Sequence, residues 1–150
     1  MEGKQTLKLA SLGLRATAAI IDTAILCVIE LLILSPLLFN PTYLAYFNQE
    51  VGPEGFNILA IMIMILLWLV YFVLQEGILG QTIGKKITKI MVVKVNGEKA
   101  GWLKVLLRNL FRFIDVLGPA PYILGMISIM VSKKRQRIGD IVAKTIVVRL

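Results

Sequence analysis

Residues 56–79, FNILAIMIMILLWLVYFVLQEGIL, decide the fold of this chain. No charged side chain occurs in this run before Glu76. At about 1.5 Å per residue, a helix of this length crosses the roughly 30 Å apolar core of a bilayer. A second apolar run, residues 14–39, has a similar length and holds three charged side chains. The two runs predict two helices that span a membrane.

The composition of the whole chain agrees with a lipid environment. Of the 150 residues, 57% are hydrophobic and 17% are charged, and the mean hydropathy is +0.80. A soluble domain of this length buries only about 70% of its unfolded surface, so it cannot hide this much apolar area. These values exclude a soluble globular domain and a disordered chain.

The chain lacks His and has a single Cys, Cys27, which excludes an intrachain disulfide, the usual Cys/His zinc site and His-based catalysis. The sequence Ile138-Gly139-Asp140 is only half of the motif pair that an intramembrane aspartyl protease needs. We therefore expect no metal site, no cofactor and no enzymatic activity. Any proton or ion chemistry must use carboxylates, Lys, Tyr or Cys27.

The rest of the chain divides where its composition changes. The β-branched runs 90–95 and 145–150 predict two strands that pair, and Asn96-Gly97 is typical of a hairpin turn. Lys104, Arg108 and Arg112 recur at four-residue spacing, which is typical of an amphipathic helix. The expected segments are an external loop (40–55), a cytoplasmic interfacial helix and strand (80–101), an amphipathic helix followed by a membrane hairpin that turns at Gly118-Pro119-Ala120-Pro121 (102–131), and a basic cytoplasmic tail with a strand (132–150).

The distribution of cations predicts the orientation. Two full crossings plus a shorter Pro-broken helical hairpin place all 17 Lys and Arg residues on the cytoplasmic side, as the positive-inside rule favours. A third full crossing would carry the basic tail outside, and it remains the alternative. We thus expect an all-α integral membrane protein of the cell membrane, multi-pass, with both termini cytoplasmic, interfacial amphipathic helices and a small two-stranded β element.

Lipid is the expected partner of the surface cations, and nucleic acid is not. The cations flank apolar runs, where anionic headgroups account for them. The residues expected to bind headgroups are Lys85, Lys86, Lys133, Lys134 and Arg135.

Charged residues inside the apolar runs cost at least about 2.5–3.5 kcal/mol each at the bilayer centre, so they need partners or water. Arg15 and Asp22 are seven residues apart and share one helix face. Arg108 and Asp115 repeat the pattern Leu-Arg-x5-Ile-Asp, which is either an internal repeat or a chance match. We expect the two aspartates to pair with nearby arginines, which include Arg112.

Four segments occur in order along the chain: LRATAAIIDTAIL, GQTIGKKITKIMVVKVNG, LLRNLFRFIDVL and QRIGDIVAKTIVV. Together they resemble the RDD family of small prokaryotic integral membrane proteins, which is named after one Arg and two Asp. The resemblance implies a transport module whose substrate is not settled. It implies that the naming residues are Arg15, Asp22 and Asp140, with Arg108 and Asp115 in family-like context. Lys144 departs from the family pattern, which often has Gly at this position.

We expect a transport module for protons or small monovalent cations that works as a homo-oligomer and uses buried carboxylates paired with arginines. The alternative is a non-catalytic scaffold or regulatory subunit that binds another membrane protein. In a purely structural role, the same charges would only fix helix packing. The expected charge network consists of Arg15, Asp22, Arg108, Arg112, Asp115 and Asp140, with Glu30 and Glu76 as further candidates.

Overall fold

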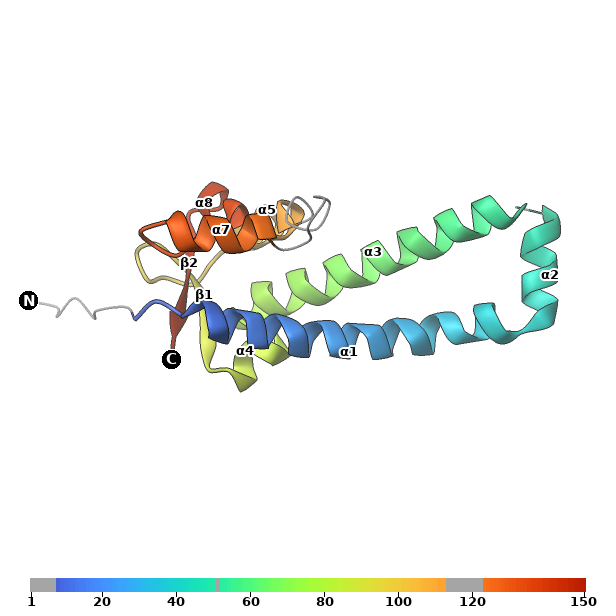
Figure 1. The fold of residues 1–150 in the computed structure, drawn as a ribbon, viewed down its shortest axis with the longest axis horizontal. Helices are drawn as coiled ribbons and strands as arrows, with labels where there is room; N and C mark the ends of the chain where they lie inside the picture. Colours follow the sequence, from blue (N-terminus) through green and yellow to red (C-terminus); the bar gives the residue numbers. More distant parts are fainter. Residues whose placement is uncertain (1–7, 51, 113–122) are drawn as a thin grey trace, which may run out of the picture. The chain divides into compact units, whose positions relative to one another are not determined.

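The computed structural model describes residues 8–50, 52–112 and 123–150 and is mostly helical (Figure 1). The chain forms two compact units, which we call the sheet unit (Met1–Asp22 with Phe72–Leu150) and the helical unit (Thr23–Tyr71). The elements in chain order are α1 (Leu12–Phe39), α2 (Pro41–Glu50), α3 (Gly52–Leu79), α4 (Ile83–Ile87), β1 (Ile90–Lys94), α5 (Trp102–Leu110), α7 (Ile123–Val131), α8 (Ile138–Val142) and β2 (Thr145–Arg149).

The two long helices α1 and α3 confirm the prediction of two long apolar helices. Their stretches Leu12–Pro36 and Asn57–Leu79 have mean hydropathies of 2.3 and 2.7 and are long enough to cross a membrane. Many of their large apolar side chains, such as Leu32 and Met62, are exposed, as lipid-facing side chains would be. Both helices run from one unit into the other.

Residues 40–55 differ from the predicted loop, because Pro41–Glu50 forms the helix α2. The side chain of Asn40 accepts a hydrogen bond from the backbone N–H of Thr42 at 3.0 Å, which caps the first turn. Pro41 follows at the first helical position, where its missing N–H costs nothing. The pair Asn40-Pro41 was the sequence signal for this helix.

The two predicted strands do pair. Strands β1 and β2 are antiparallel, from Ile90 opposite Arg149 to Lys94 opposite Thr145 (Figure 1). The Asn96-Gly97 turn is present too, with Gly97 at a φ of 89°, but it returns the chain for a single isolated bridge of Val93 with Lys99 and not for a full hairpin.

The segment before α1 also joins the sheet, which the sequence did not predict. The backbone N–H of Ala10 donates to the carbonyl of Val147 at 3.0 Å, and the N–H of Arg149 donates to the carbonyl of Lys8 at 2.8 Å. Ala10 and Val147 lie in one apolar core together with Ile90 and other buried side chains. The start of α1 is thereby anchored to the sheet.

Helix α5 is amphipathic as predicted, and its polar face points inward. Arg108 and Asn109 are buried, whereas Trp102 and Leu103 are 51% and 70% exposed. A helix of a soluble protein shows the reverse arrangement. An exposed apolar face is what a helix at a lipid interface requires.

The third apolar region is described only in part, as helix α7. The predicted turn at Gly118–Pro121 lies outside the described residues, and so does Asp115. The choice between a hairpin and a third crossing therefore stays a prediction.

Candidate functional site

Among the described residues of the sheet unit, seven charged side chains are buried, each at most 7% exposed. We call them the charge cluster. Burying a charge is costly unless other charges and hydrogen bonds compensate it, so such a group is a candidate site. Its members are Arg15, Asp22, Glu76, Lys85, Arg108, Arg112 and Asp140.

Helix α1 contributes Arg15 and Asp22, which share its buried face with Ala18. The carboxylate of Asp22 accepts two hydrogen bonds from the start of α4. The hydroxyl of Thr82 donates to Oδ2 at 2.5 Å, and the backbone N–H of Gly84 donates to Oδ1 at 2.8 Å. Asp22 therefore fixes the place where α4 begins.

Gly84 allows α4 to approach α1 this closely. A Cβ at this position would collide with the carbonyl oxygen of Ala18 and would lie 2.9 Å from the carboxyl carbon of Asp22. Only a residue without a side chain fits this contact. The same approach turns the neighbouring Lys85 into the interior.

Helix α3 contributes Glu76, which is fully buried. Its Oε1 is ion-paired with Nζ of Lys85. Its Oε2 accepts a hydrogen bond from Nδ2 of Asn109 at 3.1 Å and lies 3.4 Å from Nε of Arg108. The carboxylate is therefore shared between two cations.

Helix α8 contributes Asp140, which also contacts two cations. Its Oδ2 lies 3.3 Å from Nη1 of Arg15, and its Oδ1 lies 3.0 Å from Nη1 of Arg108. The backbone N–H of Arg137 donates to Oδ2 at 3.2 Å. Gly139 permits this packing, because a Cβ there would lie 2.6 Å from the carbonyl oxygen of Arg108.

These contacts form a chain of alternating charge that joins five helices. Arg108 is the central link, because it contacts both Glu76 and Asp140. Removing one partner of a buried ion pair costs about 3–5 kcal/mol, although well-packed apolar residues could often replace the whole pair without loss. The stability of the fold therefore does not by itself require this series of ion pairs. Its members, in order of contact, are Lys85, Glu76, Arg108, Asp140 and Arg15.

Arg112 occupies a different place in the cluster. Its guanidinium carbon lies 3.9 Å from the centre of the Phe72 ring. Phe72 and Glu76 are four residues apart on α3 and face the same side. The face of α3 that turns to α5 thus offers a carboxylate and an aromatic ring to two arginines.

The pKa of Lys85 is shifted close to neutral pH. Burial lowers the pKa of its ammonium from 10.5 to about 7, and the neighbouring Arg108 and Arg112 act in the same direction, whereas Glu76 opposes the shift. At physiological pH, Lys85 can therefore both hold and release a proton.

Several predicted residues take different positions from those expected. The expectation that Lys85 binds lipid headgroups is wrong, because its side chain is buried against Glu76. Glu76, only a further candidate in the sequence analysis, contacts two cations of the cluster, Lys85 and Arg108. Glu30 belongs to the helical unit and is partly exposed. The other expected headgroup residues are exposed, namely Lys86, Lys133, Lys134 and Arg135.

The sequence prediction missed Thr82 and Asn109. Thr82 is the N-cap of α4 and could have been found as a capping residue before a short helix. No pattern marked Asn109, whose amide joins Glu76 to the backbone of Val105. In the part of the chain that the structure describes, no group of three His, Cys, Asp or Glu residues could hold a metal ion.

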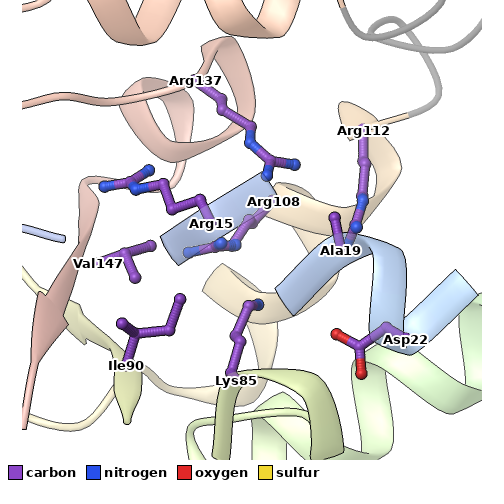
Figure 2. Close-up of a pocket in the computed structure, with 9 residues that line it drawn as sticks. All are labelled: Arg15, Ala19, Asp22, Lys85, Ile90, Arg108, Arg112, Arg137 and Val147. Carbon is purple, nitrogen blue, oxygen red and sulfur yellow. The ribbon is translucent and has the colours of Figure 1, made fainter. Parts of the chain in front are cut away.

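The two matching arginines of the Leu-Arg-x5-Ile-Asp pattern meet at one carboxylate. Arg15 and Arg108 approach the two oxygens of Asp140 from α1 and α5. In Figure 2, Arg15 and Arg108 line the same small cavity. Each arginine therefore contacts a different oxygen of Asp140.

The fold defines a membrane protein with two long apolar helices and a small sheet. The charge cluster adds a group of ionisable side chains that are buried together. The sequence model of the RDD family matches residues 9–144, and the chain therefore belongs to the RDD family. This confirms the resemblance carried by the four sequence segments. No curated protein and no solved structure matches the chain significantly.

Proposed function

We propose that this RDD protein is a transport module that exchanges protons for small monovalent cations, and that Glu76 and Lys85 are the exchanging pair. The observation that carries the proposal is the buried contact of Oε1 of Glu76 with Nζ of Lys85 at the end of an apolar helix. Ionisable residues within membrane-spanning segments are rare because they are costly, and they often belong to ion paths or proton relays.

The geometry gives the two oxygens of Glu76 different tasks. Oε2 is held by Asn109 and Arg108 and stays compensated. Oε1 is ion-paired with the ammonium of Lys85. When Lys85 releases its proton, Oε1 loses its positive neighbour, and a monovalent cation can replace it. Proton and cation then compete for one place, which is the requirement for exchange.

The pKa of Lys85 makes this competition effective near neutral pH. Burial lowers that pKa to about 7, so neither state of the ammonium is strongly favoured. The charged groups that act on Lys85 are Glu76 from α3, Arg108 from α5 and Arg112, which follows α5 in the chain. Asp22 from α1 lies in the same cluster. A fixed arginine in place of Lys85 could not perform this step, because guanidinium keeps its proton.

Topology and assembly belong to the same proposal. All 17 Lys and Arg residues lie outside the stretch from residue 16 to residue 84, which favours a cytoplasmic position for both termini. Two long apolar helices are too few to enclose a path, so we propose that the transporting form is a homo-oligomer. Cross-linking in native membranes followed by mass measurement tests this, and a monomer alone would contradict it.

The flux experiment uses purified protein in liposomes that contain a pH-sensitive dye. A pulse of Na⁺ or K⁺ is expected to drive proton movement in the wild type. Glu76→Gln and Lys85→Met are expected to abolish it. The matched control is Glu98→Gln, because Glu98 is exposed and its ion pair with Lys94 lies outside the charge cluster.

Size-exclusion chromatography in mild detergent shows whether each variant is folded. Folded Glu76→Gln protein with wild-type flux would refute the exchanging pair. Folded wild-type protein without any flux would refute transport and would favour the scaffold or regulatory alternative.

A further inference from the structure

The charge cluster surrounds a small cavity whose lining is strongly cationic (Figure 2). The cationic side chains come from α1, α4, α5, the segment that directly follows α5, and the residue that precedes α8. Asp22 is the one acidic residue among the lining residues that the structure describes. The lining consists of Arg15, Ala19, Asp22, Lys85, Ile90, Arg108, Arg112, Arg137 and Val147.

A second cavity adjoins the first and has the same character. It is lined by Arg108, Arg112, Arg137, Gly139 and Asp140, so three arginines border both spaces. Positive charge is therefore concentrated at this point and not only distributed over the surface. A low-dielectric surrounding strengthens its attraction for an anion.

Arg15 supplies donors that the protein does not use. Its side chain is 3% exposed, and Nη1 contacts Asp140. Nε and Nη2 are buried and have no hydrogen-bond partner among the described residues. A buried donor without a partner costs about 1–3 kcal/mol, and more in a charged group. An acceptor in the cavity would remove this cost.

The size of the cavity selects the occupant. Its volume is about 10 Å³, close to the smallest space that holds one water molecule. A single-atom anion such as chloride is larger than water, so the cavity must widen to hold it. Phosphate, sulfate and a phospholipid headgroup each have several oxygens around a central atom, so they would require a much larger widening than chloride.

We propose that the cavity is a halide site in which a chloride ion accepts hydrogen bonds from Arg15 and is held by the surrounding arginines. The ion would balance the excess of cations and fix the arginines that bind Glu76 and Asp140. This inference does not depend on transport, because it concerns binding to the folded protein. Bound chloride would then be required for the activity of the charge cluster.

The test measures binding directly. Purified protein in neutral detergent is transferred to halide-free gluconate buffer, and chloride replaces gluconate at constant ionic strength. Equilibrium dialysis with radioactive chloride is expected to show saturable binding of about one ion per chain. The thermal midpoint is expected to rise with chloride and to level off, as linkage requires.

Two matched variants locate the site. Arg137→Gln removes a cation that lines both cavities, and Arg135→Gln makes the same change at an exposed position two residues away. We expect Arg137→Gln to weaken chloride binding about tenfold or more, because a charge-assisted interaction is lost, and Arg135→Gln to leave it unchanged.

If Arg137→Gln fails to fold, chloride binding to the wild-type protein still tests the site. Absence of saturable chloride binding would overturn the site. Equal stabilisation by phosphate at the same ionic strength would also overturn it, because a cavity for one atom must discriminate by size. Bromide is expected to replace chloride.

Discussion

The sheet unit and the helical unit divide the chemistry of this chain between them. The helical unit, Thr23–Tyr71, contains no Lys or Arg, and its charged residues are Glu30, Glu50 and Glu54. The sheet unit contains all 17 cations and the whole charge cluster. The apolar side chains of the helical unit are compatible with surrounding lipid. The buried charges of the sheet unit depend on specific ion pairs and hydrogen bonds. Substitutions should therefore have small effects in the one and large effects in the other.

The largest difference is expected between two glutamates on the long helices. Glu76→Gln removes the shared carboxylate and leaves Lys85 and Arg108 uncompensated, which should cost about 3–5 kcal/mol of unfolding free energy. Glu30→Gln, at a partly exposed position, should change it by less than about 0.5 kcal/mol. Thermal unfolding in detergent compares them. Equal stability of the two variants would contradict the cluster.

A smaller effect is expected at the contact of α1 with α4. Asp22→Asn weakens the hydrogen bonds from Thr82 and Gly84, with a cost of about 1–3 kcal/mol. Thr82→Val removes one of the same bonds. The double variant should be more stable than the sum of the two losses predicts, because the residues interact directly. Additive losses would show that Asp22 does not hold α4 through Thr82. In liposomes, Asp22→Asn should also lose proton flux.

The pH dependence of stability sharpens the comparison further. Because the folded-state pKa of Lys85 is about 7 and its ordinary value is 10.5, the unfolded chain binds more protons between these values. The unfolding free energy should therefore rise with pH from about 7 to about 10.5 and stay flat below 7 with respect to this group. Lys85→Met should lack the rise. A falling curve in this window would mean that Lys85 is stabilised as a cation.

The smallest effect is expected at Lys144, in the sheet unit but outside the cluster. Its φ of 52° lies in the left-handed region, where Gly has no steric cost. The Gly that the family resemblance implies at this position would adopt this backbone conformation without strain. Lys144→Gly should raise the unfolding free energy by about 0.5–1 kcal/mol. Lys134→Gly should not raise the unfolding free energy, because Lys134 does not have a positive φ. An equal rise for Lys134→Gly would contradict the explanation from backbone conformation.

The fold was largely predictable because it follows from periodic patterns. The apolar runs, the β-branched runs and the amphipathic pattern of α5 each gave the correct element. The missed helix α2 has a local cap at Asn40, so a capping rule could have found it. The number of crossings depends on residues outside the described ranges.

The site was less predictable, because it depends on which face of a short helix turns inward. Lys85 and Lys86 are adjacent cations with the same surroundings in sequence, and only the close contact of Gly84 with α1 makes one buried and the other exposed. For the same reason, Thr82 and Gly84 were not expected as hydrogen-bond donors to Asp22. The spacing of residues within one segment does not predict which distant segment that segment contacts.

The proposed function requires that the ammonium of Lys85 is buried against Glu76 and exchanges its proton near neutral pH. The direct measurement is an NMR titration of protein with ¹⁵N-labelled lysine side chains in detergent, in which Lys85→Met assigns the Lys85 signal by its loss. This signal is expected to titrate with a midpoint near 7. A midpoint at the ordinary value of 10.5 would contradict it.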